Sequence, residues 1–374
     1  MKNKIIVSAA LAALLFSAAP VSAQDSDGVQ IGGQLRFRTA DTAPETGATT
    51  TSHTGRLRLN MATEVDSATK VFVELQSGGK ISSDLGPMDL HQGYMTMSGF
   101  AGGMFDVKAG RMELSYGNQR MLSALDWNNA GRAWDGLVFQ HATADHTLDM
   151  IYSKPVLNQM AGVTASTLGG LYYQRAISGW DTDVYLFNRI DGERDDMTLG
   201  ALVEGNVSGV GLSGEFAMQS GDAGTDANGA VVAADGLAMA LSANYALGSG
   251  MNVGVAYESA DDSFETIADF SHAHHGHMDL FRWGKDAYGE NNGLTDIILK
   301  GSMPIDDVWK WYGDFHMFSD SAGNALGNEL DLGIKGNLSD SVGFWGGYSM
   351  FMDDYAKDEA LESSWLFAQI VVNF

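Results

Sequence analysis

Four arginines near the start of the sequence have a spacing that could do chemistry. Arg36 and Arg38 alternate with apolar residues in one segment, and Arg56 and Arg58 do so in the next. Residues two apart in an extended strand point to the same side, so each pair shares a face. If the hairpin between them closes symmetrically around residues 46 and 47, Arg38 lies opposite Arg56 and Arg36 lies opposite Arg58. Like charges directly opposite each other are destabilising, so these four must be used or compensated.

Two interpretations of the four arginines remain open. In the first, they line the water-filled interior of a barrel formed by such strands, where they attract anionic solutes and guide them along the pore. In the second, they are structural and form ion pairs with acidic neighbours, for which Glu74 and Glu64 are the nearest candidates.

A second charged group lies between residues 110 and 136, in a segment rich in Arg, Asp, Asn and Trp. If this segment folds into the lumen, its arginines face its carboxylates across a narrow polar constriction. The alternative is that the same charges pair only to hold the loop in place. The two interpretations are compatible, because a rigid constriction needs fixed charges. The residues concerned are Arg111, Arg120 and Arg132 with Glu113, Asp126 and Asp135.

Four histidines form the one metal-like cluster in the sequence: His272, His274, His275 and His277. Imidazoles at this spacing can bind zinc or nickel opportunistically, although a single tetrahedral site would need a turn in the chain. We expect a solvated loop tip instead, with no specific metal and no cofactor. The nearby aspartates lack the spacing of a calcium loop.

The elements that must position these residues are short strands. Segments of about ten residues alternate apolar and polar residues throughout the chain, which is the pattern of strands that cross a membrane in a barrel. In one such segment Ile31, Leu35 and Phe37 oppose Arg36 and Arg38. The sequence therefore predicts an all-β fold, a transmembrane antiparallel up-and-down β-barrel.

The connections between these segments alternate in length, as periplasmic turns and extracellular loops do in such barrels. We expect long extracellular loops near residues 41–52, 78–89, 113–133, 221–235 and 261–292. The pattern predicts about 18 strands, with 16 as the alternative. A secreted β-sandwich would also alternate, but its strands are usually shorter and its loop lengths are not segregated in this way.

The two ends of the chain support export to the outer membrane. Residues 1–23 have a basic start, an apolar run and small residues before a cleavage point, as in a secretory signal peptide. Residues 24–374 then form a single barrel domain, because no linker or shift in composition divides them. The last strand places Leu366, Ile370 and Phe374 on one face and ends on an aromatic residue, which looks like the assembly signal of outer-membrane proteins.

Composition excludes several classes of function. The chain has no cysteine, so disulfides and thiolate metal sites are excluded. Loss of Lys2 and Lys4 with the signal peptide leaves 20 basic and 47 acidic residues, a charge of about −27 that argues against nucleic acid as a partner. No nucleophile elbow, phosphate loop or zinc-protease motif is present, so we expect no enzyme.

Residues 110–136 contain a motif that runs through Gly110-Arg111, Tyr116-Gly117, Arg120, Asp126-Trp127, Gly131-Arg132 and Trp134-Asp135-Gly136, and a second motif joins His272, Gly276, Met278 and Asp279 to Gly293-Leu294. With these motifs the sequence resembles the alginate export family of bacterial outer-membrane porins. Met112 departs from the glutamine that the family commonly has there. The resemblance covers most of the mature chain and implies an 18-stranded monomeric barrel, a basic lumen that passes a polyuronate, and His272 packed within its loop.

These observations predict a passive outer-membrane porin for hydrophilic, anionic solutes, with alginate-like polyuronates or their fragments as candidates. Its expected partners are outer-membrane lipid, lipopolysaccharide and the solute. The alternative function is a barrel plugged by its own loops that serves as a surface adhesin or structural anchor.

Overall fold

The computed structural model describes residues 23–26, 28–44, 47–81, 86–156, 166–225, 228–248, 250–283, 292–353 and 362–374. Residues 1–22 of the expected signal peptide lie outside the described residues, and Ala23 begins the short strand β1. Among the described residues, no helix combines the length and the apolar character that crossing a membrane requires.

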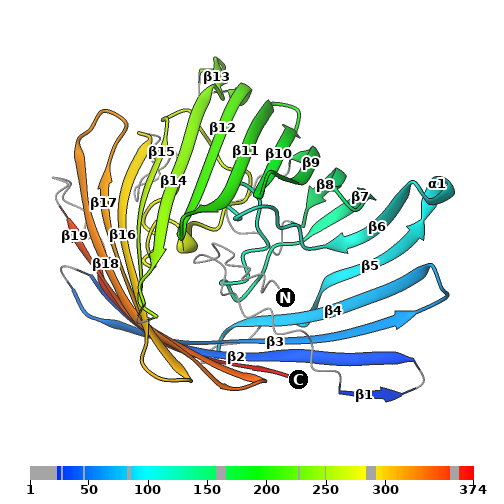
Figure 1. The fold of residues 1–374 in the computed structure, drawn as a ribbon, viewed down its shortest axis with the longest axis horizontal. Coiled ribbons are helices and arrows are strands. Elements are labelled where there is room, and N and C mark those ends of the chain that lie inside the picture. The colour runs from blue at the N-terminus through cyan, green and yellow to red at the C-terminus, as the bar shows by residue number, and fades with distance from the viewer. Residues whose placement is uncertain are drawn as a thin grey trace.

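Eighteen antiparallel strands form a closed ring, which confirms the predicted barrel and its strand number (Figure 1). Their bounds are β2 Val29–Pro44, β3 Thr50–Glu64, β4 Thr69–Lys80, β5 Asp89–Gly99, β6 Phe105–Met112, β7 Trp134–Ala142, β8 His146–Pro155, β9 Thr167–Ile177, β10 Trp180–Ile190, β11 Asp195–Val207, β12 Val210–Thr225, β14 Gly236–Ala246, β15 Asn252–Ala260, β16 Leu294–Pro304, β17 Trp309–Ser319, β18 Ala325–Ser339, β19 Val342–Asp353 and β20 Glu362–Asn373. Within the described residues, four short elements lie outside this ring: β1 Ala23–Ser26 beside β2, β13 Val231–Ala233 beside β12, α1 Phe100–Gly103, and the 3-10 turn η2 Ser271–Ala273.

The ring closes where the last strand meets the first long one. β20 pairs with β2 in the register Gln34 opposite Asn373, and the Gly33 and Phe374 backbones exchange hydrogen bonds of 2.7 and 3.0 Å. A Cβ on Gly33 would lie 2.5 Å from the Arg58 backbone oxygen and 2.7 Å from the Phe374 ring, so the absent side chain makes room for both β3 and the terminal aromatic. Closure removes the sheet edge that would otherwise leave unpaired backbone groups.

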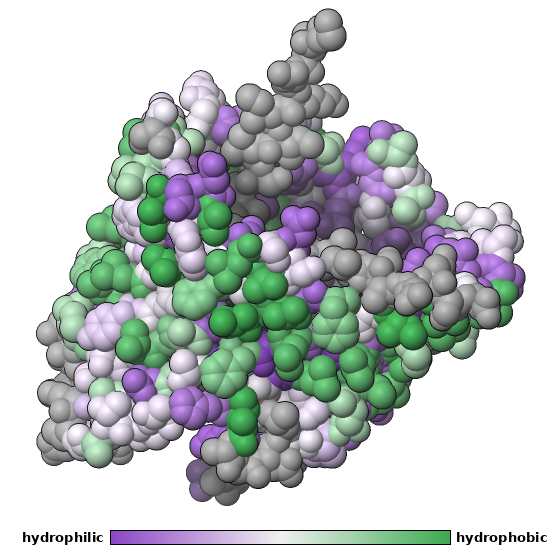
Figure 2. Space-filling model, turned by 90° about the horizontal axis from the view of Figure 1, so that it is seen from below, coloured by the Kyte–Doolittle hydropathy of each residue, from purple (hydrophilic) through white to green (hydrophobic). Residues whose placement is uncertain are grey.

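The two faces of the barrel differ in polarity as the alternation predicts. Leu366, Ile370 and Phe374 point outward and are 52%, 42% and 40% exposed, whereas Gln369 and Val371 of the same strand point inward and are buried. Figure 2 shows apolar side chains gathered in a broad patch across one outer face. Such an outward surface is stable only against lipid.

Short turns join the strands at one end. Ser178-Gly179 joins β9 to β10, and both residues have positive φ, 53° and 88°. This backbone twist suits a two-residue hairpin, and glycine adopts it at no steric cost.

The long connections lie at the other end of the barrel, and three of the predicted loops were given wrong bounds. The loop expected near 78–89 is shorter, because β4 continues to Lys80 and β5 begins at Asp89. The connection expected at 41–52 is shorter, because β2 continues to Pro44 and β3 begins at Thr50. Within 221–235, β12 continues to Thr225 and pairs with β13. Threonine and valine favour extended structure, so these hairpins continue beyond the apolar belt.

Candidate functional site

Two of the long connections fold into the interior of the barrel (Figure 1). We name residues 113–133, between β6 and β7, the first inner loop, and the described residues 261–283 and 292–293, between β15 and β16, the second inner loop. Their backbones pair: Ser123 N donates to Ala268 O at 2.8 Å, and Ala268 N donates to Met121 O at 2.9 Å. A buried apolar cluster fixes both loops to the wall, and it includes Leu122, Trp134, Phe264 and Trp283. The interior is therefore partly filled by structured chain.

The four predicted arginines do share the inward face, but the predicted register was wrong. Arg36 lies opposite Arg56, whereas Arg38 lies opposite Thr54 and Arg58 lies opposite Gln34. A shift of two residues in a hairpin keeps every side chain on its face, so the apolar pattern could not distinguish the two registers. We call Arg36, Arg38, Arg56 and Arg58 the arginine cluster.

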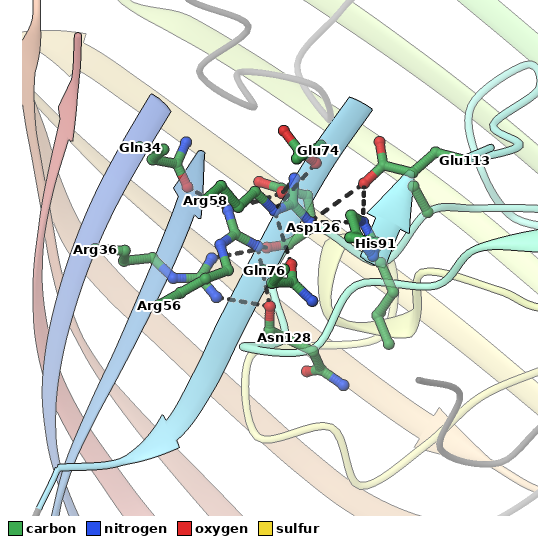
Figure 3. Close-up of polar contacts among 12 residues, drawn as sticks. Gln34, Arg36, Arg56, Arg58, Glu74, Gln76, His91, Glu113, Asp126 and Asn128 are labelled. Carbon is green, nitrogen blue, oxygen red and sulfur yellow. Dashed lines mark hydrogen bonds and ion pairs between the residues drawn. The ribbon is translucent and has the colours of Figure 1, made fainter. Parts of the chain in front are cut away.

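The arginine cluster is buried beneath the first inner loop. Its members are 3%, 9%, 1% and 8% exposed in chain order. Arg36 donates to the backbone oxygens of Asp126 and Asn128 at 2.7 and 2.6 Å, and Arg56 donates to the same two oxygens at 2.9 and 3.1 Å (Figure 3). The guanidinium groups of Arg36 and Arg56 thus both donate hydrogen bonds to the same two backbone carbonyls of the first inner loop.

Trp127, between these two carbonyls, is held by stacking. The Arg38 guanidinium lies 3.5 Å from the centre of the Trp127 ring and donates to its backbone oxygen at 2.8 Å. The His272 ring of the second inner loop also stacks on Trp127, at 3.9 Å between ring centres. Cation–π and ring stacking therefore connect the wall and both loops at one side chain.

Carboxylates from the loop and the wall compensate the arginine charges. Asp126 contacts Arg56 at 2.8 Å and Arg58 at 3.1 Å, while Glu113 contacts Arg58 at 3.2 Å. Partial burial would raise the pKa of Asp126, but the charges of Arg56 and Arg58 outweigh burial and bring its pKa below the usual value. At Glu113 burial also raises the pKa, but the charge of Arg58 opposes it, and the pKa of Glu113 falls below its usual value. Both groups are anionic at neutral pH.

Glu74, proposed from the sequence as a structural partner, lies 3.7 Å from Arg58. Glu64 does not reach the arginine cluster and instead pairs with exposed Lys70 at 2.6 Å. Glu74, His91 and Glu113 have ligand atoms within 4.8 Å of one another, a spacing that could hold a metal ion. Arg58 contacts all three residues, so its guanidinium supplies the positive charge at this position.

Two further arginines of the predicted constriction, Arg120 and Arg132, lie in the interior of the barrel. Arg120 enters the interior and pairs with Glu258 on β15 and with Glu215 on β12, at 3.1 and 3.5 Å. Arg132 donates to the backbone oxygen of Asp269 in the second inner loop at 2.6 Å. Burial lowers the pKa of Arg132 to about 10, and it stays charged at neutral pH.

Arg111 and Asp135 lie elsewhere, since the structure does not bring them to the constriction. They are opposite each other on β6 and β7 and form a bidentate ion pair of 2.8 and 3.0 Å. Their neighbours Met112 and Trp134 point inward and are buried, so Arg111 and Asp135 point outward. Sequence spacing alone did not reveal that the strands extend this far into the motif.

The four histidines do not converge on one site. His272 pairs with Asp279 at 3.2 Å, and His274 contacts the Asn118 backbone oxygen at 2.9 Å. His275 lies between Glu258 and Asp296, at 3.8 and 3.6 Å.

His277 lies 3.8 Å from Asp331. Burial lowers the pKa of His277 to about 3, so this residue is neutral at pH 7. Together, the four histidines fasten the second inner loop, so this loop is not the solvated tip that we expected from the sequence. The packing of His272 agrees with the family resemblance.

Several residues of this site were missed by sequence reasoning. Gln34 and Gln76 accept hydrogen bonds from Arg56 and Arg58, and His91 contacts Glu113 at 2.8 Å. The two glutamines stand on the inward face of the alternating pattern, which could have indicated them. His91 stands where the β4–β5 register shifts, so periodicity gave no signal for it.

A polar cavity of about 550 Å³ remains beside the first inner loop. Ser115, Tyr116 and Gly117 of the loop form one side of it, and strand residues that include four carboxylates form the other. These carboxylates are Asp149, Asp181, Asp183 and Glu204. The interior thus has a loop-covered arginine cluster and a separate water-accessible acidic wall.

The chain matches one family model by its sequence and several solved structures by its fold. Residues 28–319 match the family model described as alginate export. No curated protein matches the chain by sequence.

Three solved structures show the same fold at low sequence identity. Pseudomonas aeruginosa OccK11 (OpdR) is 9% identical, covers 95% of this chain and 100% of its own, and superposes with a TM-score of 0.68. Acinetobacter baumannii OccAB1 is 11% identical, with coverages of 94% and 99% and a TM-score of 0.66. Pseudomonas aeruginosa OccD3 (OpdP) is 13% identical, with coverages of 96% and 93% and a TM-score of 0.63.

Proposed function

We propose that this chain, which belongs to the alginate export family, is a passive channel for hydrophilic solutes. The two inner loops form the narrowest part of this channel. The chain is an outer-membrane protein of the porin class, and its outward face contacts lipid. The observation that supports conduction is the polar cavity of about 550 Å³ inside the ring, because an 18-stranded barrel is wide enough for water unless loops fill it completely. A signal peptide over residues 1–23 would deliver the chain, and one barrel would be the transporting unit.

For the cargo we propose anionic solutes, with alginate-like polyuronates or their fragments as candidates. The arginine cluster supports this class, since its four cations exceed the three carboxylates that contact it in the described part of the chain, Glu74, Glu113 and Asp126. The resulting positive field would act on a solute that passes the first inner loop. Transport would be diffusion steered by fixed charge, with no cofactor.

A second cargo class is favoured by a specific observation. The guanidinium groups are occupied by contacts with the loop, whereas Asp149, Asp181, Asp183 and Glu204 border the cavity itself. Solutes that travel through this cavity would meet a negative wall, which favours cations.

Reconstitution into a planar bilayer tests these proposals in sequence. A stable conductance supports a channel. Its absence would instead support the plugged adhesin or anchor, which the pairing of Ser123 with Ala268 between the two inner loops also favours.

The reversal potential in a salt gradient then separates the two cargo classes. For an anion channel, Arg36→Glu with Arg58→Glu lowers anion preference. For a cation channel, Asp181→Asn with Asp183→Asn lowers cation preference. Asp145→Asn, in the exposed turn between β7 and β8, is the control and should change neither. Block of the current by oligouronates tests the polyuronate directly, and unchanged current at saturating oligouronate excludes it.

A further inference from the structure

Basic side chains are rare on the outward face of the described strands. Lys and Arg point outward at Arg111 on β6, Lys154 on β8 and Arg175 on β9, as judged by alternation with the buried residues Met112, Ser153 and Tyr172. A charge that faces lipid is costly at the middle of the bilayer and tolerated only near its interfaces. The positions of Arg111 and Lys154 therefore require a polar environment outside the barrel.

Arg111 and Lys154 lie at the end of the barrel that carries the long loops. Each is the second-to-last residue of its strand, and Asp135 of β7 lies opposite both of them. The next outward residues toward the middle of the barrel are Leu137 and Tyr152, which are 39% and 59% exposed. A tyrosine at this boundary is typical of the aromatic girdle at a membrane interface. The three charged residues thus stand at the level of lipid headgroups.

Arg111 and Lys154 keep hydrogen-bond donors that no described residue uses. Arg111 donates from Nε and Nη2 to both Asp135 oxygens, and from Nη1 to the Leu90 backbone oxygen at 3.0 Å. A guanidinium has five N–H groups, so two of them remain for another acceptor. Among the described residues, the exposed ammonium of Lys154 forms no ion pair. The group therefore presents hydrogen-bond donors on two strands, and its Lys154 ammonium lies outside any ion pair.

We propose that Arg111 and Lys154 bind a phosphate group of lipopolysaccharide in the outer leaflet. The long-loop end of outer-membrane barrels faces the cell exterior, where the surrounding lipid carries phosphorylated sugars. A phosphate accepts hydrogen bonds from a guanidinium in planar geometry and attracts an ammonium as a point charge. Asp135 holds Arg111 in the orientation that leaves its remaining donors free. This site rests on the outer-membrane location and is independent of whether the interior conducts.

The test is thermal unfolding of the full chain in detergent and calcium-free buffer, with lipid A that carries two phosphates. Dephosphorylated lipid A separates phosphate recognition from acyl-chain contact, and phosphatidylglycerol tests for a phospholipid phosphate. Lys154→Gln removes the unpaired charge and leaves the Arg111–Asp135 pair intact. Arg175→Gln is the matched control, because Arg175 also points outward but lies near the short-turn end of β9.

We expect phosphorylated lipid A to raise the Tm of the wild-type protein and dephosphorylated lipid A to raise it by less than half as much. Lys154→Gln should lose at least half of the phosphate-dependent shift, while Arg175→Gln keeps it. Equal shifts with the two forms of lipid A, or a full shift in Lys154→Gln, would overturn the site. A Lys154-dependent shift of the same size with phosphatidylglycerol would overturn the assignment to lipopolysaccharide. Single-channel conductance of Lys154→Gln should match that of the wild type.

Discussion

Asp126→Asn is expected to release the first inner loop from the wall of the barrel. The Asp126 carboxylate contacts Arg56 at 2.8 Å and Arg58 at 3.1 Å, and its side chain is about one-third exposed. Hydrogen bonds to charged groups contribute about 1.5–3 kcal/mol each. Asparagine keeps one acceptor oxygen and solvent screens part of the interaction, so the expected loss is about 3 kcal/mol for the pair.

A loss of this size makes the displaced loop about a hundredfold more frequent, because each 1.4 kcal/mol changes an equilibrium tenfold. The barrel itself should stay folded, since Asp126 forms no part of the strand ladder. Single-channel recording measures the effect as the frequency of steps to a higher conductance at constant voltage. The variant should therefore show these steps far more often than the wild type.

Asp135→Asn is the matched control for this prediction. It makes the same substitution in an ion pair of similar length, but on the outward face, so its frequency of high-conductance steps should equal that of the wild type. If Asp126→Asn leaves this frequency unchanged, the carboxylate does not hold the loop. If both variants raise it equally, general destabilisation of the barrel explains the result.

Three further predictions follow from the packing of loops and strands. Gly78→Ala should displace the first inner loop and change the single-channel conductance, because the new Cβ would lie 2.6 Å from the backbone oxygen of Asn129; an unchanged conductance would contradict this close approach. The pKa of His277 is depressed to about 3, so the stability that its neutral form gives the second inner loop is present above pH 6.5 and is lost as the pH falls toward 3. The frequency of steps to a higher conductance should therefore increase in the wild type on acidification from pH 7 to pH 5, whereas His277→Asn should respond less. Identical pH profiles of the two proteins would exclude His277 as the source of the pH dependence. Gly33→Val should reduce the fraction of closed barrels by crowding both the Arg58 backbone oxygen and the Phe374 ring, measured as the fraction that migrates as the folded form in a gel without heating, and a normal fraction would show that the strands adjust.

The amino-acid sequence by itself determined the architecture of this protein. The period of two set which residues face lipid, and the alternation of short and long connections set the strand number. Both signals are local, because a strand that spans lipid must satisfy the same polarity rule at each crossing. For the same reason, the inward face of Arg36, Arg38, Arg56 and Arg58 was predictable.

Only the tertiary structure decided how the interior is arranged. The register of Arg36 against Arg56 depends on how the whole hairpin seats in the ring, because a shift of two residues leaves every face unchanged. The contact of Arg36 with the Asp126 backbone spans ninety positions of sequence and arises from loop packing. The outward position of Arg111 depends on where β6 ends. These features follow from long-range packing, which no local pattern of residues encodes.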